Sequence, residues 1–316
     1  MTAKKQSKTE LEQVLLMAES RLSGFPEGLK VDGFSYIQNS RRMLDEATGP
    51  NRICFLLPYW LKEQCQLTDE ICREMAVGNL FLMLHYFIVD DAMDTSDRQA
   101  VQDLPMAALF FGEFLNGYSR LFPYDSEFWS YYRSYVSEWA ASVSEELKGI
   151  VFTSDPAKIA RKASPLKLCS TGALLLANQS SEISRVSRLL EEALVAMQMA
   201  DDWVDWEADL VEDQGKGNSL LSLVRSSQGK PPDASLTEAD VKRFLFLDEG
   251  LTCFSLLAAR RYEACDYSGL KLEALRLFHD ALLRDLQRGA MEIAEARRQL
   301  EQGGLHYWLS RASSSS

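Results

Sequence analysis

Two clusters of aspartates have the residue types and the spacing of a metal site. Residues 90–94 read DDAMD and residues 201–205 read DDWVD. Positions i and i+4 share one face of a helix, so the first and last aspartates of each cluster are expected to lie together. Like charges at this spacing destabilise a helix by about 0.2–0.5 kcal/mol per pair, and hard divalent cations that prefer oxygen ligands would relieve the repulsion. Two such patches across a helical pocket would hold Mg²⁺ ions and, through them, a diphosphate.

The composition narrows the class of protein. The chain has 316 residues and a net charge of −12. That charge argues against nucleic acid as a partner and gives no reason to expect attraction to anionic membranes. The densest apolar stretch, residues 80–89, is half of the roughly 20 residues that a membrane span needs, so no stable membrane insertion is expected. The six cysteines lack paired metal spacing, and the polar, Lys-rich residues 1–10 do not read as a signal peptide, so we expect a cytoplasmic protein.

The elements that must position the aspartates are helices. Strand patterns are scarce, and residues 71–89 form a helix whose second half is apolar all round, as in the middle of a bundle. Residues 214–235 read as the longest loop, and Thr237 with Asp240 resembles a capping box. Further helices are predicted over residues 11–22, 104–122, 126–151, 157–178, 184–209, 237–257 and 270–302. The prediction is one all-α domain over residues 11–312, with disordered ends at 1–10 and 313–316.

Four segments in order resemble the trans-isoprenyl diphosphate synthases and the class I terpene synthases that share their fold. The apolar helix before Asp90 is similar to the one that carries the family's first aspartate motif. Residues 107–115 (AALFFGEFL) are similar to AILxGDxLL, and residues 161–164 with Gly172-Ala173 are similar to KTA…GA. Residues 198–205 (QMADDWVD) reproduce QxxDDxxD. The resemblance implies a single large helical bundle with a central cavity.

The resemblance also implies roles for individual residues. Three Mg²⁺ ions would be held between the two clusters, with Asp90, Asp94 and Asp201 as catalytic ligands and Gln198 pointing into the cavity near a substrate cation. The implied metal set is Asp90, Asp91, Asp94, Asp201, Asp202 and Asp205, with Asp91 the better candidate for an orienting role. The implied substrate-binding residues are Arg161, Lys162, Lys216, Arg52, Arg98, Phe87 and Trp203. A homodimer is expected by analogy with the family alone.

Departures from the family pattern bear on the reaction. Chain elongation needs a basic site for isopentenyl diphosphate, part of which is a GGKRxRP segment; here Asn51 and Cys54 replace its Lys and second Arg, and Arg52 remains. The family's Arg-Arg pair after the first cluster is Arg98-Gln99. A second diphosphate without matched cations is costly to bind. The sequence therefore favours cyclisation of one prenyl diphosphate to a terpene.

Two alternatives remain open. One is prenyl transfer to isopentenyl diphosphate or another acceptor, since the second cluster lacks the NSE triad of microbial terpene synthases: Asn218 and Ser222 keep its spacing, and Ser226 replaces its Glu. The other is a non-catalytic regulatory subunit, against which both intact DDxxD motifs argue. Aromatic residues suited to stabilising a cation by contact with their rings are plentiful, and the large residues Phe81, Met83, Tyr86 and Phe87 hint at a short or folded substrate chain.

Overall fold

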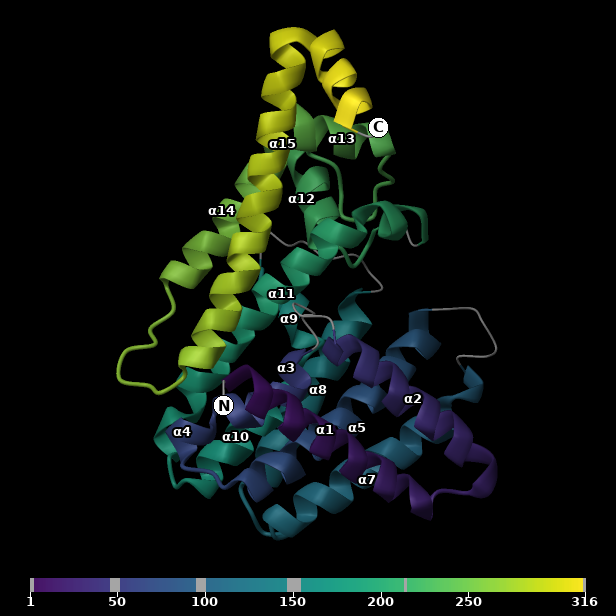
Figure 1. The fold of residues 1–316 in the computed structure, drawn as a ribbon, viewed down its shortest axis with the longest axis vertical. Coiled ribbons are helices and arrows are strands. Elements are labelled where there is room, and N and C mark those ends of the chain that lie inside the picture. The colour runs from purple at the N-terminus through teal and green to yellow at the C-terminus, as the bar shows by residue number, and fades with distance from the viewer. Residues whose placement is uncertain (1–2, 46–51, 95–100, 147–154, 213–214, 315–316) are drawn as a thin grey trace. The chain divides into compact units, whose positions relative to one another are not determined.

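The described part of the chain is helical throughout (Figure 1). The computed structural model describes residues 3–45, 52–94, 101–146, 155–212 and 215–314, and the side chains of 10–41, 52–93, 101–145, 155–212 and 215–301. Across these ranges there is no strand, which confirms the prediction of an all-α protein. The helices are α1 (Ala3–Arg21), α2 (Glu27–Asp45), α3 (Ile53–Trp60), α4 (Lys62–Cys65), α5 (Asp69–Asp94), α7 (Leu104–Leu121), α8 (Phe128–Glu146), α9 (Lys158–Arg161), α10 (Lys167–Leu176), α11 (Ile183–Glu212), α12 (Ser219–Ser227), α13 (Glu238–Phe246), α14 (Gly250–Glu263) and α15 (Glu273–Ser314).

Several boundaries differ from those predicted. The terminal segments expected to be disordered contribute to helices, because α1 begins at Ala3 and α15 ends at Ser314. Helices α2 and α3 were not predicted, and α12 lies inside the predicted loop. The capping box at the start of α13 is confirmed: Thr237 Oγ1 accepts from the Asp240 N–H, and the Asp240 carboxylate accepts from the Thr237 N–H.

The helix predicted over residues 237–257 is broken between α13 and α14. Glu249 adopts the left-handed conformation, with φ of 54°, and Gly250 follows it as the first residue of α14. A Cβ at Gly250 would lie 2.2 Å from the ring of Phe244. The close approach of α13 to the start of α14 therefore requires a glycine, and it interrupts an apolar pattern that would otherwise read as one helix.

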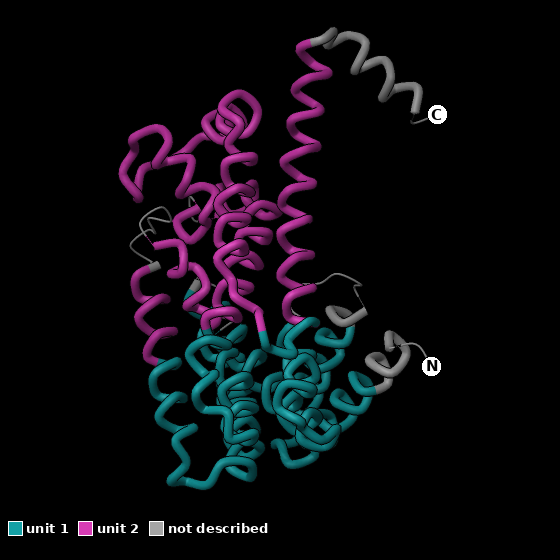
Figure 2. The backbone as a smooth tube through the Cα atoms, turned by 90° about the vertical axis from the view of Figure 1, so that its left-hand side faces the viewer, with its two compact units in different colours: residues 1–136, 164–187, 269–273 teal, residues 137–163, 188–268, 274–316 magenta. Residues whose placement is uncertain are grey.

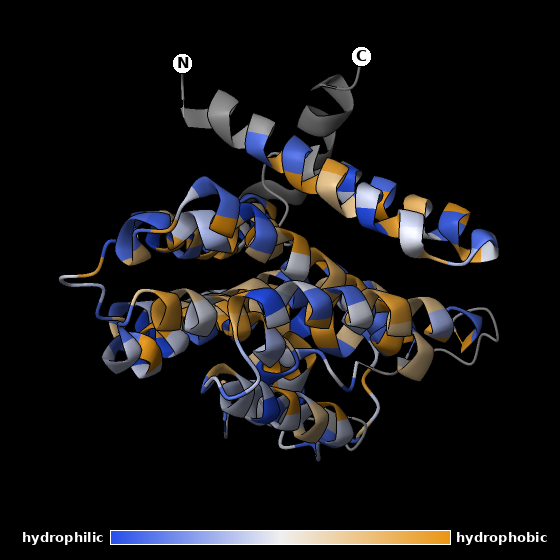
Figure 3. Cartoon of the chain, turned by 90° about the horizontal axis from the view of Figure 1, so that it is seen from below, coloured by the Kyte–Doolittle hydropathy of each residue, from blue (hydrophilic) through white to orange (hydrophobic). Residues whose placement is uncertain are grey.

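The chain divides into two compact units (Figure 2). Unit 1 comprises Met1–Val136, Ser164–Ser187 and Gly269–Glu273, and unit 2 comprises Ser137–Ala163, Arg188–Ser268 and Ala274–Ser316. Helices in both units carry hydrophobic residues beside hydrophilic ones along their length, the pattern of amphipathic helices that pack in a core (Figure 3). The first aspartate cluster belongs to unit 1 and the second to unit 2, so each is described with the residues of its own unit.

Unit 1 is built around α5, which packs against α7, α3 and α1. Gly78 allows the Tyr118 ring to lie directly on α5, since a Cβ there would be 2.5 Å from Cε2 of that ring. The Tyr118 hydroxyl donates to Asn79 Oδ1 at 2.9 Å, which gives the hydroxyl and the amide oxygen a partner inside an apolar core. By length and composition, residues 69–93 would be long and apolar enough to cross a membrane, but 67% of that helix's most apolar window is buried inside the protein, as in a core helix.

Unit 2 contains a buried arginine that joins two loops. Arg225 on α12 is 2% exposed, and it donates from Nε to Ala234 O at 2.8 Å and from a terminal nitrogen to Gly215 O at 3.0 Å. Elsewhere in the unit, Arg261 on α14 makes a bidentate ion pair with Glu192 on α11. The buried charge of Arg225 is thus satisfied by carbonyl oxygens, and the half-buried Arg261 by a carboxylate.

The burial of His279 leads us to expect that the stability of unit 2 depends on pH. Its ring is 1% exposed, packs edge-on to Tyr262, and lies 3.2 Å from the Tyr267 hydroxyl at Nδ1. Burial lowers its pKa to about 4; Asp280 raises that pKa and Arg261 lowers it. Because the pKa of His279 is lower in the folded state, the unfolded state binds a proton more readily. The folded state therefore keeps its full stability above the unfolded pKa of 6.5 and loses stability as the pH falls through 4.

We expect the free energy of unfolding to fall by about 3 kcal/mol between pH 7 and pH 4 on account of His279 alone. Urea unfolding at both values, compared between wild type and His279→Gln, isolates this contribution from that of the carboxylates. An equal loss of stability in the two proteins would contradict it.

Candidate functional site

The first aspartate cluster ends helix α5 in unit 1. Asp90 is half-buried and Asp91 is exposed; the side chain of Asp94 lies outside the described residues. Burial and the hydrogen bond to Asp103 raise the pKa of Tyr36 on α2, and the charge of Asp91 adds to this shift. Burial likewise raises the pKa of Tyr86, with further contributions from Tyr132 and Asp90. The charges of Asp90 and Asp91 thus act on neighbouring tyrosines, while burial is the larger cause of both shifts.

In the second cluster, Asp202 points into the protein. It is 3% exposed, and its Oδ1 accepts from Gln198 Nε2 at 2.7 Å. Its Oδ2 accepts from the Ser219 N–H at 2.7 Å and also from the Ser219 hydroxyl. Burial raises the pKa of Asp202 to about 6, while Lys162 and these hydrogen bonds act in the opposite direction. Both carboxylate oxygens are thus occupied by protein donors, and Gln198 has a partner within the cluster.

Asn218 completes the attachment of α12 to α11. Its Nδ2 donates to the backbone oxygen of Asp202 at 2.8 Å and to Asp209 Oδ2 at 2.8 Å. Its Oδ1 accepts from the Leu221 N–H at 3.0 Å and so caps α12. Two donors and one acceptor of a single amide are satisfied here, a combination that neither a carboxylate nor a hydroxyl provides.

Asp201 and Asp205 lie on the outer side of the same helix. Both are exposed, in contrast to Asp202 between them. The pKa of Asp201 is raised by partial burial of its carboxylate and by the neighbouring charge of Asp205. Lys162 lowers this pKa, and Asp209 raises it. The structure therefore has a pair of carboxylates at i and i+4 on one helix face, as the spacing predicted, and Lys162 is near enough to Asp201 to affect its pKa.

The remaining predicted binding residues lie in different surroundings. Arg161 pairs with Asp155 at 3.2 Å, and Lys216 is exposed in the turn before α12. Arg52 and Phe87, both in unit 1, are half-buried. Trp203 lies against α15, where a Cβ at Gly289 would be 2.9 Å from its Nε1. Arg98 falls outside the described residues.

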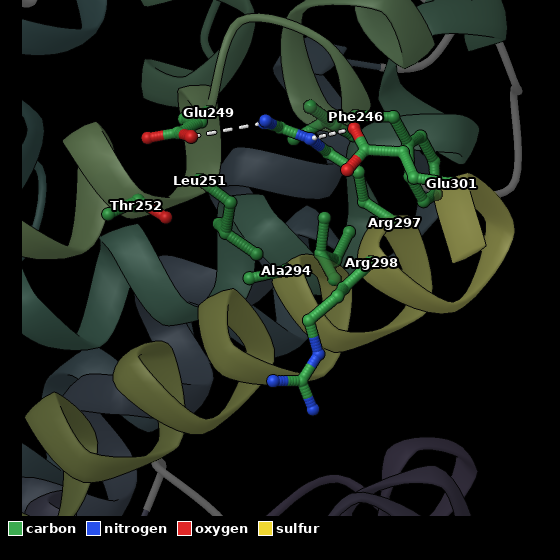
Figure 4. A pocket seen from close by; sticks show the side chains of 10 residues that line it. Phe246, Glu249, Leu251, Thr252, Ala294, Arg297, Arg298 and Glu301 are labelled. Carbon is green, nitrogen blue, oxygen red and sulfur yellow. Dashed lines mark hydrogen bonds and ion pairs between the residues drawn. The ribbon is translucent and has the colours of Figure 1, made fainter.

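Two pockets of unit 2 lie away from these aspartates. One, of about 240 Å³, is formed by residues of α13, α14 and α15, and Arg297 at its edge is held between Glu249 and Glu301, at 3.1 and 3.0 Å (Figure 4). The other, of about 360 Å³, places Arg161 among three glutamates. The three glutamates are Glu138, Glu145 and Glu191. Arg298 and Lys158 are the second basic residues of the two pockets, and carboxylates balance or outnumber the basic residues at both. Neither pocket therefore offers the excess of cations that a diphosphate needs.

Sequence reasoning missed two residues of this arrangement. Asp209 stands four positions after Asp205, so extending the i+4 pattern by one turn would have found it. Ser219 carried no such signal, because its contact with Asp202 joins positions 17 residues apart across a turn. Asn218 was singled out for its spacing to Ser222, and the structure assigns it instead to the cap of α12 and to Asp202.

The donor set suits a hard divalent cation. Exposed carboxylates of Asp201 and Asp205 share one face, and carboxylate oxygens are the preferred ligands of Mg²⁺. Among the described residues no group of three or more His, Cys, Asp or Glu side chains is gathered around a single metal position. The pair would therefore supply only part of a coordination shell, which Mg²⁺ usually completes with water and phosphate oxygens.

Comparisons with known proteins add no relative to this description: no family model, no curated protein and no solved structure matches the chain.

Proposed function

We propose that this protein ionises an allylic prenyl diphosphate with Mg²⁺ and that the resulting substrate cation cyclises to a terpene. The observation that carries the proposal is the arrangement of residues 198–205. Asp202 is bound to Gln198 and Ser219, while Asp201 and Asp205 remain exposed on one face beside Lys162. A fixed, repelling pair of carboxylates on a rigid helix is suited to binding a cation rather than to packing.

Each residue has a task on this proposal. Asp201 and Asp205 bind metal from α11, and Asp90 with Asp94 does so from α5. Bound Mg²⁺ would stabilise the negative charge that develops on the departing diphosphate. Lys162 and Lys216 donate hydrogen bonds to diphosphate oxygens, and aromatic residues such as Phe87 face the substrate cation.

Intermolecular prenyl transfer is the second candidate, because the same ionisation precedes it. The half-buried Arg52 is the one basic residue kept from the segment that would bind isopentenyl diphosphate. The third candidate is a non-catalytic regulatory subunit, which would keep the fold and control a partner enzyme. The three differ in what they release from one substrate: a hydrocarbon or alcohol, a longer diphosphate, or nothing.

A product assay tests the proposal. Purified protein with Mg²⁺ is incubated with geranyl, farnesyl or geranylgeranyl diphosphate, each with and without isopentenyl diphosphate. In the reactions without isopentenyl diphosphate we expect release of pyrophosphate and formation of a hydrocarbon or alcohol, which gas chromatography–mass spectrometry detects. Addition of EDTA should prevent the formation of both products. Longer prenyl alcohols after dephosphorylation, present only with isopentenyl diphosphate, would replace cyclisation by chain elongation. No pyrophosphate in any reaction would contradict diphosphate ionisation by this chain alone.

A further inference from the structure

The cap and first residue of α12 attach to α11 at Asp202 and Asp209, close to the exposed aspartates. Asn218 Nδ2 reaches the Asp202 backbone oxygen and, two turns further along, Asp209 Oδ2. Ser219 holds the Asp202 carboxylate through its N–H and its hydroxyl. Asp205 lies between these attachment points in the sequence, and Asp201 immediately precedes the first of them. The second attachment point, Asp209, is three residues before the end of α11 at Glu212.

Such attachment matters because the aspartates repel each other. Asp201, Asp205 and Asp209 follow one another at four-residue spacing on α11. Like charges at that spacing destabilise a helix, so loosening of the helix there would relieve their repulsion. The hydrogen bonds from Asn218 and Ser219 oppose that loosening, since they are buried and the residues that make them are 2% and 0% exposed. Buried hydrogen bonds that hold a neighbouring residue fix the geometry of a site before the ligand arrives.

We infer that Asn218 and Ser219 are positioning residues that hold the Asp201–Asp205 face ready for its cation. Asp202 then acts as the carboxylate through which α12 holds α11, rather than as a metal ligand. The inference rests on the proposed function, in that Asp201 and Asp205 are the carboxylates that bind metal. The start of α12, the next helix after α11 in the sequence, would thus keep the metal-binding face of α11 rigid.

The substitution Asn218→Ser separates this role from helix capping. Serine retains an oxygen that accepts from a helix N–H, so α12 keeps a cap, whereas both Nδ2 donors are lost. Thr237→Ala is the matched control: it removes the cap of α13 in the same unit, and the side-chain hydrogen bonds of Thr237 are with Asp240 of α13 and not with α11. Urea unfolding of each variant establishes that both remain folded.

Binding of Mn²⁺, followed by the loss of the free-ion signal in electron paramagnetic resonance, measures the site without turnover. We expect Asn218→Ser to raise the Mn²⁺ dissociation constant by about tenfold, as for residues that orient metal ligands, and Thr237→Ala to leave it unchanged. Equal dissociation constants in wild type and Asn218→Ser would overturn the inference and leave the proposed function standing. Equal weakening in both variants would also overturn it, because general loosening would then account for the effect.

The same measurements can contradict the proposed function independently of the positioning role. If wild type binds Mn²⁺ and Asn218→Ser weakens that binding, but no prenyl diphosphate releases pyrophosphate, the positioning role stands while ionisation is contradicted. If wild type binds no Mn²⁺, with or without inorganic pyrophosphate, both are overturned.

Discussion

The Asp201→Ala protein is expected to release pyrophosphate from its prenyl diphosphate about a thousandfold more slowly than wild type. Losing one ligand of a catalytic metal removes several kcal/mol of stabilisation from the charge on the leaving group, and about 4 kcal/mol corresponds to this factor. The fold should be intact, because Asp201 is exposed and its removal relieves repulsion with Asp205 by about 0.2–0.5 kcal/mol. Initial rates of pyrophosphate release at saturating Mg²⁺, with urea unfolding alongside, provide the measurement.

Asp90→Ala should behave in the same way if both clusters act on one diphosphate. Glu207→Ala is the matched control, since Glu207 is an exposed acid on the same helix α11 that was not predicted to bind metal. Its rate should stay within about twofold of wild type, as expected for a surface substitution away from the site. Full activity of Asp201→Ala, or equal losses in Asp201→Ala and Glu207→Ala, would refute the metal assignment.

The Asp202→Ala protein is expected to lose about 3 kcal/mol of stability, the largest effect of any single aspartate here. The substitution strips three donors of their acceptor, namely Gln198 Nε2 and the N–H and hydroxyl of Ser219. Hydrogen bonds to a charged group contribute about 1.5–3 kcal/mol each, and buried donors left without an acceptor are penalised. Part of this is offset, because the burial that raises the pKa of Asp202 to about 6 is itself unfavourable and disappears with the carboxylate.

The comparison with Asp205→Ala makes this result specific. Asp205 is exposed and three residues further along the same helix, so its removal should change the free energy of unfolding by less than about 0.5 kcal/mol. Urea titrations of the two variants at pH 7.5 measure the difference. Similar stabilities for Asp202→Ala and Asp205→Ala would mean that the contacts between Asp202 and α12 do not hold the helices together in solution.

The two aspartate predictions separate residues that the motif treats alike. In the pattern DDxxD, Asp201, Asp202 and Asp205 are equivalent acids, and all three were assigned to metal. The structure distinguishes them by direction, since Asp202 faces the protein and the other two face solvent. We therefore expect activity to depend directly on Asp201 and Asp205, and stability to depend on Asp202.

Local chemistry was enough to predict what repeats along one helix. The all-helical class follows from apolar spacing of 3.6 residues and from the near absence of strand patterns, and the capping box at Thr237 and Asp240 follows from two residues three positions apart. The shared face of Asp201 and Asp205 follows from helical geometry alone. Each depends on residues within one or two turns of each other, so the sequence by itself determined them.

Only the tertiary structure decided the features that join distant residues. Nothing local marks Ser219 as the partner of Asp202, Arg225 as a buried residue, or Gly250 as the point where Phe244 approaches the chain. Helix α12 was missed because the glycines at 215 and 217 indicate a loop, whereas the Asn218 cap and the buried face of residues 219–225 stabilise a helix just beyond them. Packing gives such segments their structure, and packing is a property of surfaces that meet only after the chain has folded.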